Sequence, residues 1–120
     1  MQIAEQSNCV PSAPRAERIA LLNDILRRTG CGGQIVITRG VGGLCGFEPR
    51  ELLSVLAAYD DFDALNDPHG ERDFGAIDHC GAELLWKIDY YSPDLQFGSD
   101  DPANPTVTHR VLTVMLAEEY

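Results

Sequence analysis

Four side chains of the kinds that bind metal ions alternate at every second position of one short segment: Asp67, His69, Glu71 and Asp73. In an extended segment alternate side chains share a face, so these four would converge on one site. Carboxylates and an imidazole suit Mg²⁺, Mn²⁺ or Zn²⁺, and such an ion can activate a water molecule for hydrolysis. Pro68 and Gly70 oppose this geometry because both residues favour a bend. The segment is therefore a candidate site of a metal-dependent hydrolase, with a solvated loop as the alternative.

The acidic balance of the chain suggests a different function. The 120 residues include 19 Asp and Glu against nine Lys and Arg, which gives a formal charge of -10. Nucleic acid and anionic membranes are polyanions, so this balance argues against both as direct partners and favours a basic protein. The carboxylates are densest in two segments, which we predict to form an interaction surface: Asp60, Asp61, Asp63, Asp67, Asp94, Asp100 and Asp101. A non-catalytic interaction or regulatory domain is the function we favour.

Apolar spacing predicts the elements that would position these loops. Helical spacing occurs over about residues 13–29 and 49–59, and strand-like runs occur at 34–38, 74–77 and 82–91. Residues 39–46 contain four Gly and are expected to form an irregular turn. Asn104 followed by Pro105 is typical of a helix start, and Val107, Val111 and Met115 continue at helical spacing, which predicts a helix over residues 106–118.

These elements predict an α+β fold, in which a small antiparallel or mixed sheet packs with about three helices. The sheet is expected to have about three strands, including a hairpin over residues 74–91. In the first helix, Arg15, Arg18, Arg27 and Arg28 are expected to lie largely on the solvent side. The predicted core residues come from the last strand and the last helix: Trp86, Ile88, Tyr90, Val111 and Met115.

Residues 1–12 are expected to form a flexible N-terminal tail, and residues 13–120 a single α+β domain. The four Cys include no C-x-x-C pair, and the N-terminus has no apolar signal sequence. No apolar run is long enough to span a membrane. A cytoplasmic protein with reduced thiols is therefore expected, with no cofactor apart from the candidate divalent metal. The oligomeric state is left open.

Five motifs carry a family resemblance: TRGV (38–41), NDPHGERDFG (66–75), WKIDYYSPDL (86–95), GSDDPANP (98–105) and RVLTVMLAEEY (110–120). Together they resemble the bacterial domain-of-unknown-function family 3768, over the chain from about residue 21 onward. The resemblance implies a short single-domain protein of alphaproteobacteria, often encoded beside plasmid or conjugative-element genes. In that setting an acidic surface would imitate nucleic acid and block a DNA-binding defence protein. Such relatives carry Tyr where this chain has His69, which argues against an essential role for that imidazole.

Overall fold

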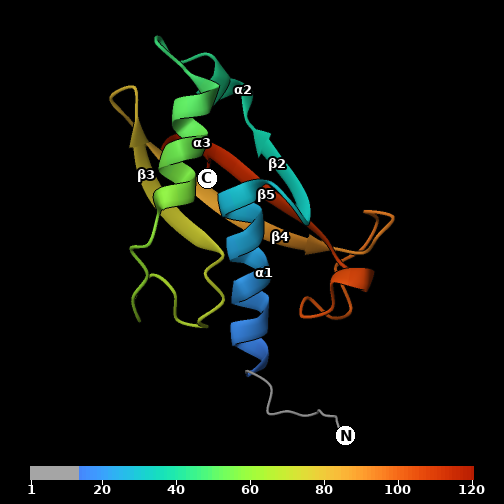
Figure 1. Cartoon of the computed structure of the whole chain (residues 1–120). Helices are drawn as coiled ribbons and strands as arrows, with labels where there is room; N and C mark the ends of the chain where they lie inside the picture. The colour runs from blue at the N-terminus through green and yellow to red at the C-terminus, as the bar shows by residue number, and fades with distance from the viewer. Residues whose placement is uncertain (1–13) are drawn as a thin grey trace, which may run out of the picture.

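The computed structural model describes residues 14–120, so the predicted tail over residues 1–12 lies outside the described residues. The α-helices and one strand come first along the described chain, and the other strands follow with two short 3-10 turns (Figure 1). In chain order the elements are α1 (Arg15–Thr29), β2 (Gly33–Ile37), α2 (Arg39–Gly42), α3 (Pro49–Ala58), β3 (Phe74–His79), β4 (Ala82–Tyr91), η1 (Pro105–Val107), β5 (His109–Leu116) and η2 (Ala117–Glu119). No helix in this part of the chain combines the length and the apolar character needed to cross a membrane.

The four strands form one mixed sheet in the order β2-β5-β4-β3. β5 pairs in parallel with β2 and antiparallel with β4, and β3 and β4 form an antiparallel hairpin. Cys80 and Gly81 close the hairpin with φ values of 55° and 75°, the positive values that a two-residue turn needs to match the twist of its strands. The α+β prediction is confirmed, but the sheet has four strands rather than about three.

The fourth strand corrects the predicted helix over residues 106–118. Asn104 does cap a turn through its side chain, which accepts a hydrogen bond from the backbone N–H of Thr106, but only the short 3-10 turn η1 follows. The next residues form β5, in which the buried side chains of Arg110, Leu112 and Val114 alternate with less buried ones. Val and Thr fit a pleated strand between two partners, and this tertiary pairing outweighs the helical spacing of the valines.

The Gly-rich turn predicted over residues 39–46 is also partly wrong, because its first half is the short helix α2. The side chain of Thr38 caps this helix by accepting a hydrogen bond from the backbone N–H of Val41, at 3.4 Å. Val41 is fully buried in the core, so its packing and the Thr38 cap both favour a helical turn in a segment that is otherwise rich in Gly.

α1 and α3 cover one face of the sheet (Figure 1), and the apolar core lies between these layers. Trp86 and Ile88 of β4 are buried there, while Tyr90 is half-buried at the end of the same row. Val111 and Met115 share the opposite face of the sheet, because neighbouring strand residues point to opposite sides. Met115 is buried on that face and Val111 is half-buried.

Candidate functional site

The side of α1 that faces the sheet carries three polar residues among its apolar ones. Asn23 is 0% exposed, Asp24 is buried, and Arg27 is 1% exposed, so the expectation that Arg27 faces solvent is wrong. Asn23 and Asp24 are adjacent, Arg27 follows one helical turn later, and the buried side chains of Ile19 and Leu26 lie on the same side of the helix. Buried polar and charged groups are tolerated only with partners, so their contacts determine what α1 holds in place.

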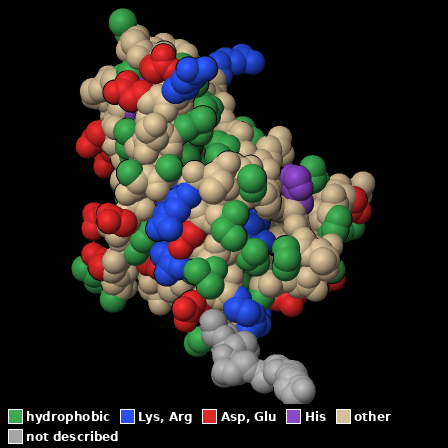
Figure 2. Space-filling model, in the orientation of Figure 1, with side chains coloured by type: hydrophobic (Ala, Val, Ile, Leu, Met, Phe, Trp, Pro, Cys, Tyr) green, Lys and Arg blue, Asp and Glu red, His purple; other side chains and the backbone are tan. Residues whose placement is uncertain are grey.

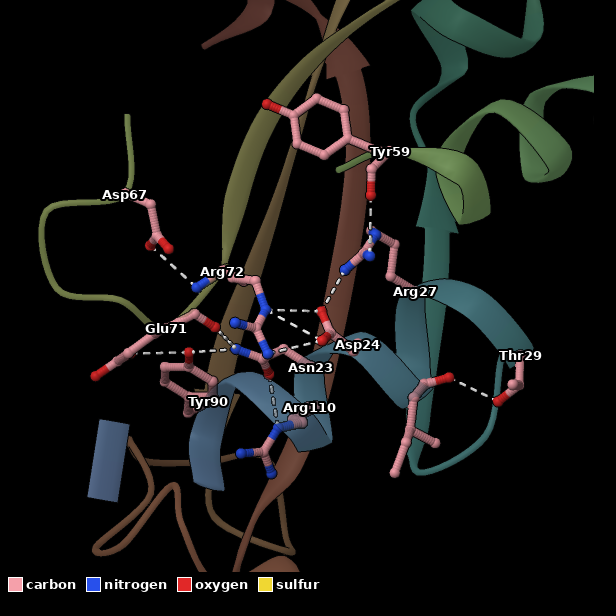
Figure 3. Close-up of polar contacts among 11 residues, drawn as sticks. Asn23, Asp24, Arg27, Thr29, Tyr59, Asp67, Glu71, Arg72, Tyr90 and Arg110 are labelled. Atoms are coloured by element: carbon pink, nitrogen blue, oxygen red, sulfur yellow. Dashed lines mark hydrogen bonds and ion pairs between the residues drawn. The ribbon is translucent and has the colours of Figure 1, made fainter. Parts of the chain in front are cut away.

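Asp24 is the centre of a buried ion-pair cluster (Figure 3). One of its carboxylate oxygens lies 2.8 Å from a guanidinium nitrogen of Arg27, and the other lies 2.8 Å from one of Arg72. Burial by itself would raise the pKa of Asp24, but hydrogen bonds from Arg72 and Arg27 hold that pKa below its ordinary value. Arg72 belongs to the segment between α3 and β3, so the cluster ties that segment to α1.

The guanidinium of Arg27 also joins α1 to α3. It donates a hydrogen bond to the backbone oxygen of Tyr59, at 3.1 Å. It lies over the rings of Phe62 and Trp86, 5.4 Å and 5.7 Å from their centres. Arg27 and Arg72 share the single carboxylate of Asp24, so one positive charge is in excess. Aromatic faces attract a desolvated cation, and the two rings therefore help to offset the free-energy cost of burying that charge.

Asn23 connects the same segment to β4 and β5. Its amide nitrogen donates to the backbone oxygen of Glu71, at 3.0 Å, and to the hydroxyl of Tyr90, at 2.8 Å. Its amide oxygen accepts a hydrogen bond from Nε of Arg110, at 2.8 Å. The Tyr90 hydroxyl in turn donates to the Glu71 carboxylate, at 3.0 Å (Figure 3). Burial raises the pKa of Tyr90, which keeps this hydroxyl protonated as a donor.

The segment held by these contacts is residues 60–73, which we call the acidic loop. Its own hydrogen bonds fold it further: the Asp63 carboxylate accepts from the backbone N–H of Leu65 and Asn66, at 2.8 Å and 2.9 Å. The Asp67 carboxylate accepts from the backbone N–H of Arg72, at 3.0 Å. The side chains of Asp60, Asp61 and Asp63 remain exposed. These hydrogen bonds hold the acidic loop in one conformation, in which carboxylates face solvent.

In a comparison with family models, residues 37–119 match the model described as Protein of unknown function (DUF3768). The chain belongs to this family. The match begins at the last residue of β2 and ends in η2, so it includes the acidic loop and excludes α1. No curated protein and no solved structure matched the chain. Membership in DUF3768 therefore confirms the resemblance found in the sequence and assigns no activity.

In this DUF3768 member, the four residues predicted to bind a metal ion do not lie along an extended strand. Gly70 and Arg72 have φ values of 71° and 53°, so the backbone turns between the alternate positions. Asp67 accepts a hydrogen bond from Arg72, and Glu71 accepts one from Tyr90. Within residues 14–120, no group of three or more His, Cys, Asp or Glu side chains is arranged to hold a metal ion. The metal site stays a prediction from the sequence.

Asp73 is the most unusual carboxyl group of the acidic loop. Burial is the main cause that raises its pKa, and the nearby carboxylates of Glu71 and Asp67 raise that pKa further. His69, which is exposed, lowers it only slightly. Ionisation of Asp73 is therefore less favourable in the folded chain than in water, and a positive charge beside this carboxylate would stabilise its ionised form.

The second acidic segment predicted from the sequence lies on the other side of α1 (Figure 1). Asp101 forms an ion pair with Arg15 at the start of that helix, at 3.1 Å. Asp94 accepts hydrogen bonds from the Ser92 hydroxyl, at 2.5 Å, and from the backbone N–H of Gln96, at 3.1 Å. The two acidic segments predicted to form one surface are thus separate patches, with α1 between them.

Proposed function

We propose that this protein is a non-catalytic interaction domain and that its acidic loop binds a basic region of a partner protein. The observation that carries the proposal is the anchoring of the loop: Asp24 and Asn23 fix its backbone through Arg72 and Glu71, while Asp60, Asp61 and Asp63 stay exposed. A surface that is already ordered loses little conformational entropy when a partner binds, and this favours affinity.

The distribution of charge along the chain supports the same proposal. Residues 59–120 contain 14 Asp and Glu against three Lys and Arg, whereas residues 14–58 contain four against six. Acidic side chains gather at the edge of the molecule beside the acidic loop, and basic side chains lie over α1 (Figure 2). A surface of one sign attracts partners of the opposite sign and speeds their association, and added salt weakens this effect.

The experiment compares two variants that remove equal charge from different surfaces. Asp60→Asn/Asp61→Asn/Asp63→Asn neutralises the acidic loop and leaves side-chain oxygens that can still cap its turns. Asp78→Asn/Glu83→Gln/Glu118→Gln neutralises three exposed carboxylates elsewhere. The probe is a fluorescent peptide of ten alternating Lys and Arg residues, titrated by anisotropy at low and at physiological salt.

We expect the loop variant to bind the peptide about tenfold more weakly than the control variant, because three exposed ion pairs of about 0.5 kcal/mol each would be lost. Wild-type binding should also weaken as salt is added. Equal weakening by both variants would show that only net charge matters, and it would overturn the assignment of the loop as the binding surface.

A metal-dependent hydrolase is the second candidate, and one observation favours it. Asp73 is half-buried, and burial raises its pKa first, with repulsion from the carboxylates of Glu71 and Asp67 adding to the rise. A divalent cation placed among these carboxylates would relieve that repulsion and could activate a water molecule. A test with metal ions, described in the Discussion, separates this candidate from the interaction domain.

A further inference from the structure

Two apolar features of the surface have no part in the proposed function. One is a hollow on the outer side of α1, lined by Leu21, Asp24, Ile25, Arg28 and Thr29, with a volume of about 360 Å³. The other is the loop formed by residues 92–98, which we call the tip. Each exposes large apolar side chains to water, an arrangement that is unfavourable unless another surface covers them.

The hollow lies on the opposite side of α1 from the core. Leu21 and Ile25 are 49% and 47% exposed. They lie one helical turn apart and therefore form a continuous apolar strip on the surface of α1. Hydrophobic side chains beside Lys and Arg side chains are visible over this helix (Figure 2). The fold itself does not use this strip, because α1 packs on the sheet through residues such as Ile19 and Leu26.

The tip is held in shape by its own hydrogen bonds. The backbone N–H of Ser92 donates to the backbone oxygen of Phe97, at 2.7 Å, and that of Leu95 donates to the backbone oxygen of Ser92, at 2.8 Å. The Ser92 hydroxyl accepts from the backbone N–H of Phe97, at 3.2 Å. A bridge between Tyr91 and Gly98 closes the base of the tip. The tip therefore presents its side chains without needing to become ordered on binding.

Leu95 and Phe97 are the side chains that the tip presents, with exposed fractions of 51% and 70%. Leu95 has a φ of 64°, a left-handed conformation that Gly or Asn adopts more easily. An exposed Leu in this conformation benefits neither the backbone nor the core. Its presence indicates that the apolar side chain itself is used, in contact with another surface.

The charges around the tip and the hollow are opposite. Asp94 and Asp100 are exposed in and beside the tip. Arg28 lines the hollow, and the carboxylate of Asp24, which also lines it, is already paired with two guanidinium groups, so this region is positive overall. An acidic apolar tip and a basic apolar hollow are complementary both in hydrophobicity and in charge.

The tip of a chain is not placed to fill its own hollow. Asp101, which follows the tip, is paired with Arg15 at the first turn of α1. The centre of the hollow, at Ile25, lies ten residues further along the helix, or about 15 Å. The tip is fixed by its own hydrogen bonds, so contact between the two features requires a second molecule.

We propose that the tip of one copy of this protein, with Leu95 and Phe97 leading, inserts into the hollow on α1 of a second copy. Phe97 and Leu95 would pack on Leu21 and Ile25, and Asp94 would lie close to Arg28. This contact uses a different surface from the acidic loop, so each proposal can fail without the other.

The test is sedimentation velocity over about 1 μM to 300 μM, a range suited to the weak association expected of a small interface. Wild-type protein should form dimers or larger species as its concentration rises. Phe97→Ser should weaken association about tenfold or more, because a Phe side chain would no longer be buried. Leu95→Gly should also weaken association while keeping the turn, since Gly favours a positive φ. Leu65→Ser removes an exposed apolar side chain that is in neither the tip nor the hollow, and it should leave association unchanged.

A mixing experiment distinguishes this contact from other kinds of self-association. Ile25→Glu places a negative charge in the hollow and should prevent association, as Phe97→Ser does at the tip. A mixture of the two variants should associate again, because one supplies an intact tip and the other an intact hollow. A wild-type protein that stays monomeric at all concentrations, or two variants that fail to associate when mixed, would overturn the proposal.

Discussion

The acidic loop and the tip are both acidic surface segments, but different contacts hold them in place. The acidic loop is tied to α1 through the buried residues Asn23 and Asp24, which lie about fifty residues away in the sequence. The tip is closed by contacts among its own and flanking residues, over at most seven positions, from Tyr91 to Gly98. The conformation of the acidic loop should therefore depend on distant parts of the fold, whereas that of the tip should not.

Replacement of Asp24 by Asn should have the largest effect, and it should affect the acidic loop selectively. The change leaves Arg27 and Arg72 without their shared carboxylate, and removing one partner from a buried ion pair costs about 3 to 5 kcal/mol of the free energy of unfolding. Urea denaturation measures that loss. Hydrogen exchange should quicken in residues 60–73 and stay unchanged in the tip. Equal quickening in both segments would contradict the distinction between them.

Replacement of Asn23 by Ala should have the next largest effect. It removes three hydrogen bonds, so that Nε of Arg110 and the backbone oxygen of Glu71 each lose the Asn23 amide as a partner. Unsatisfied buried groups cost about 1 to 3 kcal/mol each, so we expect a loss of about 2 to 3 kcal/mol in the free energy of unfolding. Asp94→Asn is a suitable control because Asp94 is exposed, and it should leave stability almost unchanged. A change below 1 kcal/mol for Asn23→Ala would show that water replaces the amide.

The dependence of stability on pH should differ between Asp73 and Asp24. The pKa of Asp73 is raised in the folded chain, so protonation stabilises the fold, and this stabilisation is lost as pH rises through the raised pKa. The pKa of Asp24 is lowered, so its contribution is present above the ordinary value of 3.8 and is lost as pH falls below it.

Asp73→Asn should therefore increase stability at pH 7 and flatten the pH profile just above 3.8, without changing the acid-induced loss below that value. Thermal melts of the wild type and the variant across pH measure both effects. A variant as stable as the wild type at every pH would show that Asp73 is solvated in both states.

Metal ions should have the smallest effect. We expect no change in the melting temperature when chelator-treated protein receives Mg²⁺, Mn²⁺, Zn²⁺ or Ca²⁺, because Asp67 and Glu71 already accept hydrogen bonds. Saturation of a site at a hundred times its dissociation constant would instead add about 2.7 kcal/mol, a shift of several degrees. Such a shift, lost in Asp73→Ala, would favour the hydrolase and prompt nuclease and phosphatase assays.

The spacing of apolar, Pro and Gly residues predicted the helices and the hairpin that form through contacts between residues near one another in the sequence. The helix near residues 13–29, the helix near 49–59 and the hairpin over 74–91 were all predicted, because helical periodicity, Pro at a helix start and a short Gly-containing turn act within a few residues. The dense carboxylates of the two loops were equally visible. The pattern around Asn23 also carried a signal, since Asn23 and Arg27 directly follow Leu22 and Leu26 in the apolar repeat of the helix.

The sequence by itself determined the α+β class, the acidic character and the positions of the loops, because composition and short-range spacing fix these properties. Only the tertiary structure decided that residues 109–116 form a strand, because pairing with β2 and β4 outweighs a helical spacing of valines. It also decided that Asn23, Asp24 and Arg27 face inward, because their partners outside α1 come from positions 32 to 87 residues away. The apolar repeat of the helix hints that Asn23 and Arg27 lie near its buried side, but the partners that they meet there depend on how α1 packs against the sheet.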